Sequence, residues 1–196
     1  MKQVLIIHGG SSFDSYDRYV ERLKTGSIDY ERLKRTVKWR ESIVDELPEY
    51  DVLLPTFPNS ANAVYGEWKI YFEKLLPLLN GEEVILVGYS LGAMFLAKYL
   101  NDSPLAKPVA KILLVAPCYD DETVEDLGSF KVTSAINVVM SATEIHLFHS
   151  SDDSVSPFTE LAKFERDIPT AIPHTFSDRN HFFQPFFPEL RDVIKK

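Results

Sequence analysis

The chain contains one cysteine, Cys118, among its 196 residues, so an internal disulfide framework is impossible. Disulfides stabilise proteins of oxidising compartments, and an odd thiol is typical of a reducing cytoplasm. No glycine-rich turn surrounds Cys118, and we therefore expect it to pack in the interior rather than act as a nucleophile. The cysteine content argues against a small, disulfide-stapled secreted domain.

Long hydrophobic runs and an excess of basic charge are absent too. No run of about 18 apolar residues occurs, and the apolar run before His8 is too short for a signal peptide. The net charge is −8, whereas a nucleic-acid-binding domain needs a basic stripe. Basic residues do cluster in YERLKRTVKWR (30–40), but acidic neighbours indicate a solvated helix face. We expect a cytoplasmic protein with no membrane or nucleic-acid partner.

Short apolar runs recur along the chain, and each is nearly continuous rather than alternating. Continuous hydrophobicity indicates burial on both faces, as in a parallel sheet covered by helices. A weaker sixth run, AIPHTFS (171–177), contains Pro173 and predicts an edge strand. The five stronger runs are QVLIIH (3–8), YDVLLP (50–55), EVILVG (83–88), KILLVAP (111–117) and EIHLFHS (144–150).

The segments between these runs carry helical spacing, which predicts a doubly wound α/β domain with right-handed crossovers. A helix over 156–168 is expected to begin with a Ser156 cap and a proline, and another closes the chain at 185–196. Residues 118–143 break the rhythm, and we expect them to form a small cap on a single domain spanning 1–196. Two apolar stripes define the other helices: Tyr30, Leu33, Val37, Val44 and Leu47, then Val64, Trp68, Tyr71, Leu75 and Leu79.

The motif Gly88-Tyr89-Ser90-Leu91-Gly92 stands where the third strand gives way to a helix. A sharp turn there strains the central residue and crowds its neighbours, and glycines two places away on either side remove Cβ clashes. The Ser90 hydroxyl is then exposed at a helix N-terminus, which stabilises a developing negative charge. This placement predicts a nucleophile elbow rather than a simple glycine-rich turn.

A nucleophilic serine needs a base and an acid, and in such sheets the acid and then the histidine follow later in the chain. We predict that His181, in the polar loop SDRNHFFQPFF, is the base. His146, His149 and His174 lie on strand runs and are expected to be packed or surface residues.

The acid is expected in the loop LFHSSDDSVSPF, where Asp152 and Asp153 are both candidates. Neighbouring residues of an extended loop point in roughly opposite directions, so only one of the two carboxylates can face His181. An aspartate pair before a helix can also act only as a cap.

The oxyanion of an acyl-transfer intermediate needs two N–H donors. One is expected from the backbone of Leu91, and the other from Gly10 or Ser11 in the loop HGGSS after the first strand. A glycine pair after a strand can also form a simple turn or a phosphate-binding loop, but the full dinucleotide fingerprint is absent.

These residues resemble the α/β-hydrolase family, in particular its compact single-domain serine hydrolases related to retinoblastoma-binding protein 9, which are described as predicted esterases. The resemblance covers essentially the whole chain, through LIIHGG, LLPTFPN, GEWKIYFEKLLPLL, VGYSLG, LFHSSDDSVSPF and DRNHFF. It implies a six-stranded, mostly parallel sheet of order 2-1-3-4-5-6. It also favours Asp153 over Asp152, because the family's acid has the same spacing from the proline at 157.

Three positions depart from the family pattern. Tyr89 stands where histidine often precedes the nucleophile, Ser156 replaces a usual valine, and Asn180 replaces a glycine before His181. Asparagine tolerates positive φ better than most residues. None of the three changes removes a catalytic group.

The predicted function is that of a serine hydrolase acting on a small carboxylic ester or thioester, with no cofactor and no metal. The site comprises Ser90, His181 and Asp153, with Gly10 and Leu91 binding the oxyanion. Two alternatives stay open: a protein-binding module with little turnover, and an acyltransferase or amidase that uses the same triad. A protein partner is compatible with the sequence but is not indicated by any motif.

Overall fold

The computed structural model describes residues 1–28, 30–34 and 36–196. At its centre is one six-stranded sheet of order β2-β1-β3-β4-β5-β6, in which every neighbouring pair is parallel. The predicted fold class and strand order are therefore confirmed, and the weak sixth run forms the edge strand. The strands are β1 (Lys2–Ile7), β2 (Tyr50–Leu53), β3 (Glu83–Tyr89), β4 (Val109–Val115), β5 (Ala142–Ser150) and β6 (Ile172–Phe176).

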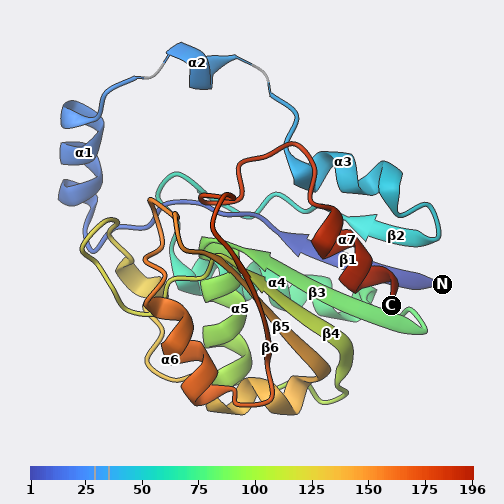
Figure 1. The fold of residues 1–196 in the computed structure, drawn as a ribbon. Helices are drawn as coiled ribbons and strands as arrows, with labels where there is room; N and C mark the ends of the chain where they lie inside the picture. The colour runs from blue at the N-terminus through green and yellow to red at the C-terminus, as the bar shows by residue number, and fades with distance from the viewer. Residues whose placement is uncertain (29, 35) are drawn as a thin grey trace.

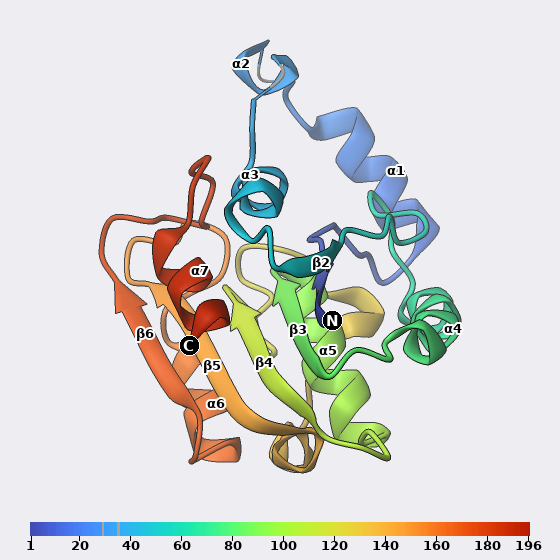
Figure 2. The ribbon, with the colours of Figure 1, turned by 90° about the vertical axis from the view of Figure 1, so that its right-hand side faces the viewer.

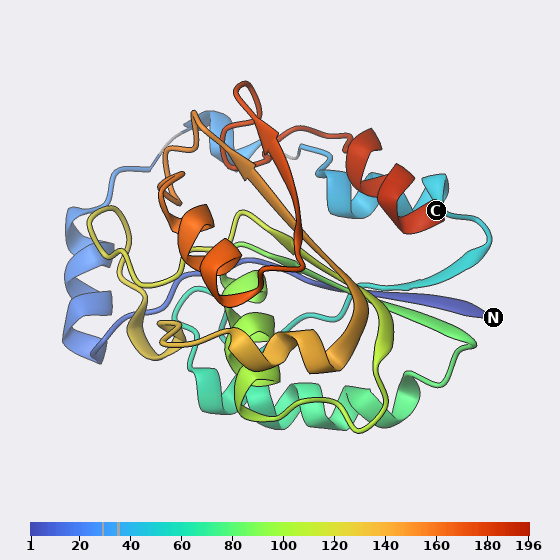
Figure 3. The same ribbon diagram turned by 60° about the horizontal axis from the view of Figure 1, so that its bottom comes forward.

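Helices cover both faces of this sheet, as the continuous hydrophobic runs require (Figure 1). One face packs against α4 (Tyr65–Leu75), α5 (Leu91–Asp102) and α6 (Glu160–Asp167). The opposite face packs against α3 (Trp39–Glu46) and α7 (Pro188–Lys195). Figure 3 shows the two layers, with teal α4 and green α5 below the strands and cyan α3 and red α7 above them. The sheet thus separates two apolar cores.

The predicted stripe over 30–47 is wrong, because this stretch is not one helix. A short helix, α2, spans Tyr30–Leu33, and α3 begins only at Trp39. The new helix resets the phase, so that Trp39, Ile43 and Leu47, four residues apart, make the buried face. The other predicted members of the stripe are exposed: Tyr30, Leu33, Val37 and Val44.

The second predicted stripe, Val64 to Leu79, is confirmed only in part as a buried face, since Trp68 is fully buried while Val64 is exposed.

The helix predicted from Ser156 begins later, at Glu160, because Ser156 belongs to the preceding loop. Its hydroxyl donates to the Pro117 carbonyl at 2.9 Å instead of capping the helix.

A helix that the sequence reading missed, α1 (Tyr16–Thr25), lies with α2 away from the sheet (Figure 2). No residue of α1 is buried, so it contributes nothing to either core. Within the described residues, no helix is both long enough and apolar enough to cross a membrane.

Residues 118–143 contain two 3₁₀ turns, Gly128–Phe130 and Ile136–Ser141, before β5 begins at Ala142. Buried side chains from this segment, including Phe130 and Val138, join the α5 core. The segment is thus anchored in the domain rather than laid loosely over it. That it acts as a cap on a bound substrate stays a prediction.

Two buried carboxylates of α6 hold this segment in place. Glu160 Oε2 accepts the backbone N–H groups of Tyr119, Asp120 and Asp121 at 2.7, 2.9 and 3.0 Å. Asp167 Oδ2 accepts the Tyr119 hydroxyl at 2.5 Å. Each carboxylate replaces lost water with several directed donors, which is the condition for burying such a charge.

These contacts set the protonation of both acids. Burial by itself raises the pKa of Glu160, but the Lys163 ammonium and the three N–H donors outweigh it and lower that pKa to about 2. The pKa of Asp167 is also lowered, since Arg166, the Tyr119 hydroxyl and a backbone N–H oppose the effect of burial. Both side chains therefore stay ionised in the folded protein well below neutral pH.

Replacing Glu160 with glutamine should lower the free energy of unfolding at neutral pH by about 1.5–3 kcal/mol, the usual contribution of hydrogen bonds to a charged group. A folded pKa below the unfolded one means that the stabilisation is complete above ~pH 4.5 and is lost as the pH falls toward ~2. The variant should therefore lose stability less steeply than the wild type on acidification. Urea unfolding at several pH values between neutrality and about pH 3 measures both effects.

Glu165→Gln, an exposed position on the same helix, is the matched control and should change neither quantity. Identical acid slopes for Glu160→Gln and the wild type would contradict the assignment.

Candidate active site

Ser90 occupies a strained turn between β3 and α5, with φ 54° and ψ −120°. Positive φ is rare for a residue with a side chain and is held here by tight packing on both sides. A Cβ at Gly88 would lie 2.6 Å from the Ala93 Cα, and one at Gly92 would lie 2.5 Å from the Ile7 carbonyl oxygen. Space alone therefore requires glycine at both positions.

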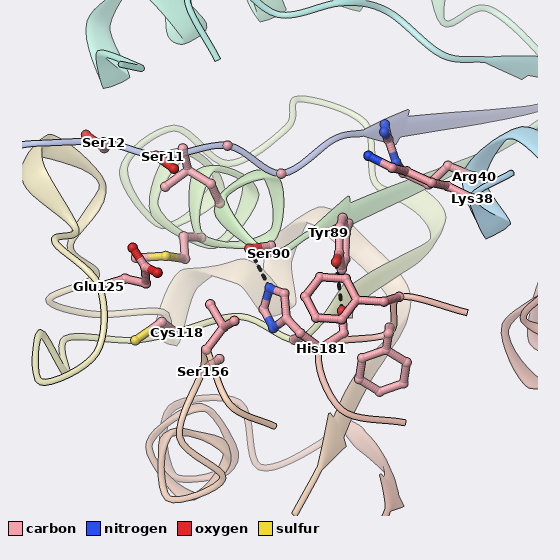
Figure 4. A pocket seen from close by; sticks show the side chains of 18 of the residues that line it. Ser11, Ser12, Lys38, Arg40, Tyr89, Ser90, Cys118, Glu125, Ser156 and His181 are labelled. Carbon is pink, nitrogen blue, oxygen red and sulfur yellow. Dashed lines mark hydrogen bonds between the residues drawn. The ribbon is translucent and has the colours of Figure 1, made fainter. Parts of the chain in front are cut away.

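The turn presents the Ser90 hydroxyl to a histidine from the other end of the chain (Figure 4). His181 Nε2 lies 2.9 Å from Ser90 Oγ, and His181 Nδ1 lies 2.9 and 3.0 Å from the two Asp153 oxygens. The Asp153 side chain is fully buried, and that of His181 is 5% exposed. This is the hydrogen-bond order of a nucleophile, a base and an orienting acid.

The structure brings Asp153, and not Asp152, to His181. Asp153 Oδ1 also accepts the N–H groups of Val155 and Ser156 at 2.8 and 2.9 Å, which fix the carboxylate in the loop. Asp152 is exposed and turns the other way, accepting the Asn180 N–H at 2.9 Å. Its carboxylate stabilises the loop that carries His181 but does not contact the His181 ring.

Two of the three departures from the family pattern support the histidine loop. The Tyr89 hydroxyl donates to the His181 carbonyl at 2.7 Å, and Figure 4 shows this bond beside the Ser90 contact. Asn180 adopts φ 46°, and its side-chain oxygen accepts the His181 N–H at 2.7 Å. With the Ser156 bond to Pro117, all three substituted side chains make hydrogen bonds in the loops that carry the site.

The two candidate oxyanion donors on the first loop differ in their partners. The Ser11 N–H is already bonded to the Ser60 carbonyl at 2.9 Å. For the Gly10 N–H, no partner exists among residues 1–28, 30–34 and 36–196. Gly10 and Leu91 both line the cavity over Ser90, and Leu91 opens α5, where helix N–H groups have no intrahelical acceptor. Gly10 is therefore the better placed donor.

His8, to which the sequence reading gave no role, holds this loop. Its Nδ1 lies 2.6 Å from the Gly9 carbonyl oxygen, and its Nε2 accepts the Phe57 N–H at 2.8 Å. Burial lowers the pKa of His8, so the ring is neutral with its proton on Nδ1. A histidine directly before a glycine pair is the signal that sequence reasoning overlooked.

The remaining histidines stand apart from Ser90. His146 Nδ1 lies 3.0 Å from His174 Nε2 in a stacked pair on β5 and β6. His149 is fully buried, and burial lowers its pKa to about 4. None of the three lines the cavity, and the prediction that they are packed residues fits this placement.

The cavity around Ser90 has a volume of about 960 Å³ and contrasting ends. Leu91, Met94 and Leu127 supply apolar wall close to the nucleophile. The lining includes the acids Asp121, Glu125 and Asp126 and the basic residues Lys38 and Arg40, and Figure 4 shows Glu125 on the opposite side of Ser90 from Lys38 and Arg40. Lys38 is exposed, as the predicted solvated face over 30–40 requires, whereas Arg40 is half-buried, and Arg35 lies outside the described residues.

Cys118 also lines the cavity, but it is held as a thiol. It donates to Glu160 Oε2 at 3.2 Å, and burial followed by the charge of Glu160 raises the pKa of Cys118 well above its usual range. In the one described group of acids close enough to share a metal ion, Asp14 and Glu122 are exposed, and Asp126 and Glu122 are paired with Arg18 and Lys131. Neither feature competes with Ser90 as a reactive centre.

A model of the serine hydrolase family matches residues 36–181, the segment that contains Ser90, Asp153 and His181. The chain belongs to the serine hydrolase family. This membership confirms the resemblance to α/β-hydrolases and makes the protein a serine hydrolase enzyme. No curated protein matches the chain in sequence.

Solved structures share the fold of this serine hydrolase over nearly their whole length. The ydeN gene product from B. subtilis is 21% identical with a TM-score of 0.78, covering 100% of this chain and 97% of its own. Est1E from Butyrivibrio proteoclasticus, solved with ferulic acid bound, is 10% identical with a TM-score of 0.65, covering 100% and 87%. The thioesterase domain from the curacin biosynthetic pathway is 11% identical with a TM-score of 0.58, covering 100% and 91%.

Removing the Tyr89 hydroxyl should loosen the histidine loop. We expect Tyr89→Phe to lower kcat for ester hydrolysis by about three- to tenfold, since a buried carbonyl loses its donor at a contribution of about 1 kcal/mol. Tyr71→Phe, a half-buried tyrosine of α4 outside the cavity, should leave kcat unchanged. Steady-state kinetics on one short-chain ester compares the two, and equal kcat values for both variants would refute the role of Tyr89.

Proposed function

We propose that this serine hydrolase cleaves a small carboxylic ester or thioester through Ser90, His181 and Asp153, by way of an acyl-enzyme. The observation that carries the proposal is the continuous hydrogen-bond chain from Ser90 Oγ through the His181 ring to the buried Asp153. Each link is within normal hydrogen-bond distance in the free protein. The open cavity gives an acyl substrate access to the hydroxyl.

In the acylation step, His181 Nε2 takes the Ser90 proton as the oxygen attacks the substrate carbonyl carbon. The carbonyl π electrons move to its oxygen, which the N–H groups of Gly10 and Leu91 bind. The C–O or C–S bond of the substrate then breaks, and His181 gives its proton to the departing alcohol or thiol. In the second step His181 takes a proton from water, hydroxide attacks the acyl-enzyme, and Ser90 leaves with the proton restored.

Asp153 does not exchange a proton in this cycle. Its carboxylate accepts the His181 Nδ1–H, which leaves Nε2 free to act as the base, and it stabilises the imidazolium that forms. The two backbone donors to Asp153 keep the carboxylate in place without neutralising it. The acid therefore works by orientation and charge.

The ester and thioester classes are favoured because the fold neighbours include Est1E with bound ferulic acid and a thioesterase domain. The acyltransferase or amidase alternative uses the same intermediate and differs only in what attacks it. A binding module without turnover has no need of a hydrogen-bonded base beside an accessible serine. Competition between water and added amine or alcohol acceptors separates hydrolysis from acyl transfer.

Ser90→Ala should abolish both ester hydrolysis and covalent labelling by a fluorophosphonate probe, because the hydroxyl that His181 Nε2 contacts is lost. His181→Ala should reduce both nearly as far, since the hydroxyl loses its base. His174→Ala, on the outer strand, is the matched control and should keep labelling intact. Gel-based labelling and initial rates decide the matter, and retention of more than a few per cent of activity in Ser90→Ala would overturn the proposal.

Substitutions of the two neighbouring aspartates should have very different effects on kcat. Asp153→Asn should lower kcat by roughly 10⁴-fold, the magnitude known for the equivalent change in a serine-protease triad, because an amide cannot hold the productive tautomer. Asp152→Asn should lower kcat by less than about tenfold, since it disturbs only the hydrogen bonds that Asp152 accepts from Ser150 and Asn180. Measuring kcat of both variants on one short-chain ester tests this, and the opposite ranking would move the acid to Asp152.

A further inference from the structure

One end of the cavity is lined by basic side chains that take no part in the proposed reaction. Lys38 and Arg40 both line it, and Figure 4 shows them on the Tyr89 side of Ser90, opposite Glu125. The whole chain has a net charge of −8, so this end is a local reversal of sign next to the nucleophile. A cleft lined by positive charge attracts and orients anions.

The backbone that carries both basic residues is held in place by a buried tryptophan. Trp39, between them, is 2% exposed and packs edge-on against the rings of Tyr89 and Phe187, with centroids 5.7 Å apart in each case. Trp39 also opens α3, so the backbone at 38–40 is set by the core. Side chains that start from a rigid element lose less entropy when a ligand orders them.

Arg40 is a partly buried cation whose charge is compensated only in part. Arg40 is half-buried, and this burial lowers its pKa although the charges of Glu41 and Tyr89 partly oppose the effect. Neither Arg40 nor Lys38 forms an ion pair through its side chain with any residue in the described part of the chain. The neighbouring Glu41 carboxylate instead accepts the Lys38 backbone N–H at 3.0 Å. A partly desolvated cation that forms no ion pair leaves room for an anion.

The acidic end of the cavity differs in this respect. Asp126 accepts the Gly128 N–H at 3.1 Å and lies 3.4 Å from Arg18 Nε. Asp121 accepts the Thr123 N–H at 2.8 Å. These two carboxylates serve the local loop structure. Glu125 forms no ion pair with the described residues, so the cavity keeps acidic charge at this end and the two basic charges of Lys38 and Arg40 at the other.

We propose that Lys38 and Arg40 bind an acidic group, a carboxylate or a phosphate, that the substrate carries at a distance from its scissile bond. This inference rests on the proposed hydrolase function and narrows its substrate class to anionic esters or thioesters. The Arg40 guanidinium offers a planar pair of donors that matches either oxyanion, and the Lys38 ammonium adds a mobile point charge. Anchoring the acid at this end places the ester along the cavity toward Ser90.

Matched esters test the proposal. Aryl monoesters of dicarboxylic acids of increasing length are compared with neutral esters of monocarboxylic acids of equal length. A second series carries a carboxylate or a phosphate on the alcohol side instead. The quantity measured is the ratio of kcat/KM for the anionic ester to that for its neutral match. The wild type should prefer at least one anionic series by about tenfold or more, and added salt should weaken the preference.

Arg40→Gln and Lys38→Gln should each lower this ratio by about threefold or more, and the double variant by about tenfold or more. Arg40→Lys keeps the positive charge but loses the planar pair of guanidinium donors. Its ratio should therefore lie between the ratio of Arg40→Gln and that of the wild type. Lys74→Gln, an exposed lysine of α4 outside the cavity, should keep the wild-type ratio. If Arg40→Gln does not fold, Lys38→Gln and Arg40→Lys carry the comparison.

A wild-type ratio near one in both series, or a ratio unchanged in the double variant, would overturn the inference. Labelling with a neutral fluorophosphonate separates this failure from a failure of the hydrolase proposal. If Ser90 is labelled and neutral esters turn over while the ratio stays flat, only the anion site is wrong. If Ser90 is neither labelled nor active on any ester, the proposed function itself fails.

Discussion

The positive φ of Ser90 is the constraint on which the rest of the site depends. A non-glycine residue in such a conformation costs about 1–3 kcal/mol and persists only where its surroundings over-determine it. Here both close packing and a hydrogen bond hold Ser90 in this conformation. Gly88 and Gly92 allow β3, α5 and the end of β1 to approach within contact distance, and the Ser90 N–H is bonded to the Val115 carbonyl at 2.8 Å.

That bond belongs to a series that aligns the ends of neighbouring strands. The Ala116 N–H, just beyond β4, donates to the Phe148 carbonyl of β5 at 2.8 Å. The Ser151 N–H, just beyond β5, donates to the Phe176 carbonyl of β6, again at 2.8 Å. Each strand is thus fastened to the next one at the point where it leaves the sheet. The loops that carry Ser90, Asp153 and His181 consequently begin from one shared edge.

Buried polar side chains behind the cavity form hydrogen bonds that also fix the loops lining it. Glu160 and Asp167 do not touch the reacting atoms, but they fix residues 119–121 and 135 through backbone donors. Tyr89, Asn180 and Ser156 do the same for the histidine and acid loops. A site built on loops gains precision from such contacts, because each one removes a freedom that the loop would otherwise keep.

Local patterns in the sequence determined the strands, their parallel pairing and the elbow around Ser90. Continuous apolar runs need both faces of a sheet covered, and two glycines flanking a serine at a strand end suit only a crowded turn. The break between α2 and α3 is not predictable from residue spacing, because spacing does not reveal where one helix ends and where the next begins with a new buried face. The choice between Gly10 and Ser11 depended on a carbonyl at Ser60, and the environment of Arg40 depended on the cavity formed with residues 89 and 181. Those features required the tertiary structure, because hydrogen-bond partners and charge compensation are set by groups that lie far apart in the chain and meet only after folding.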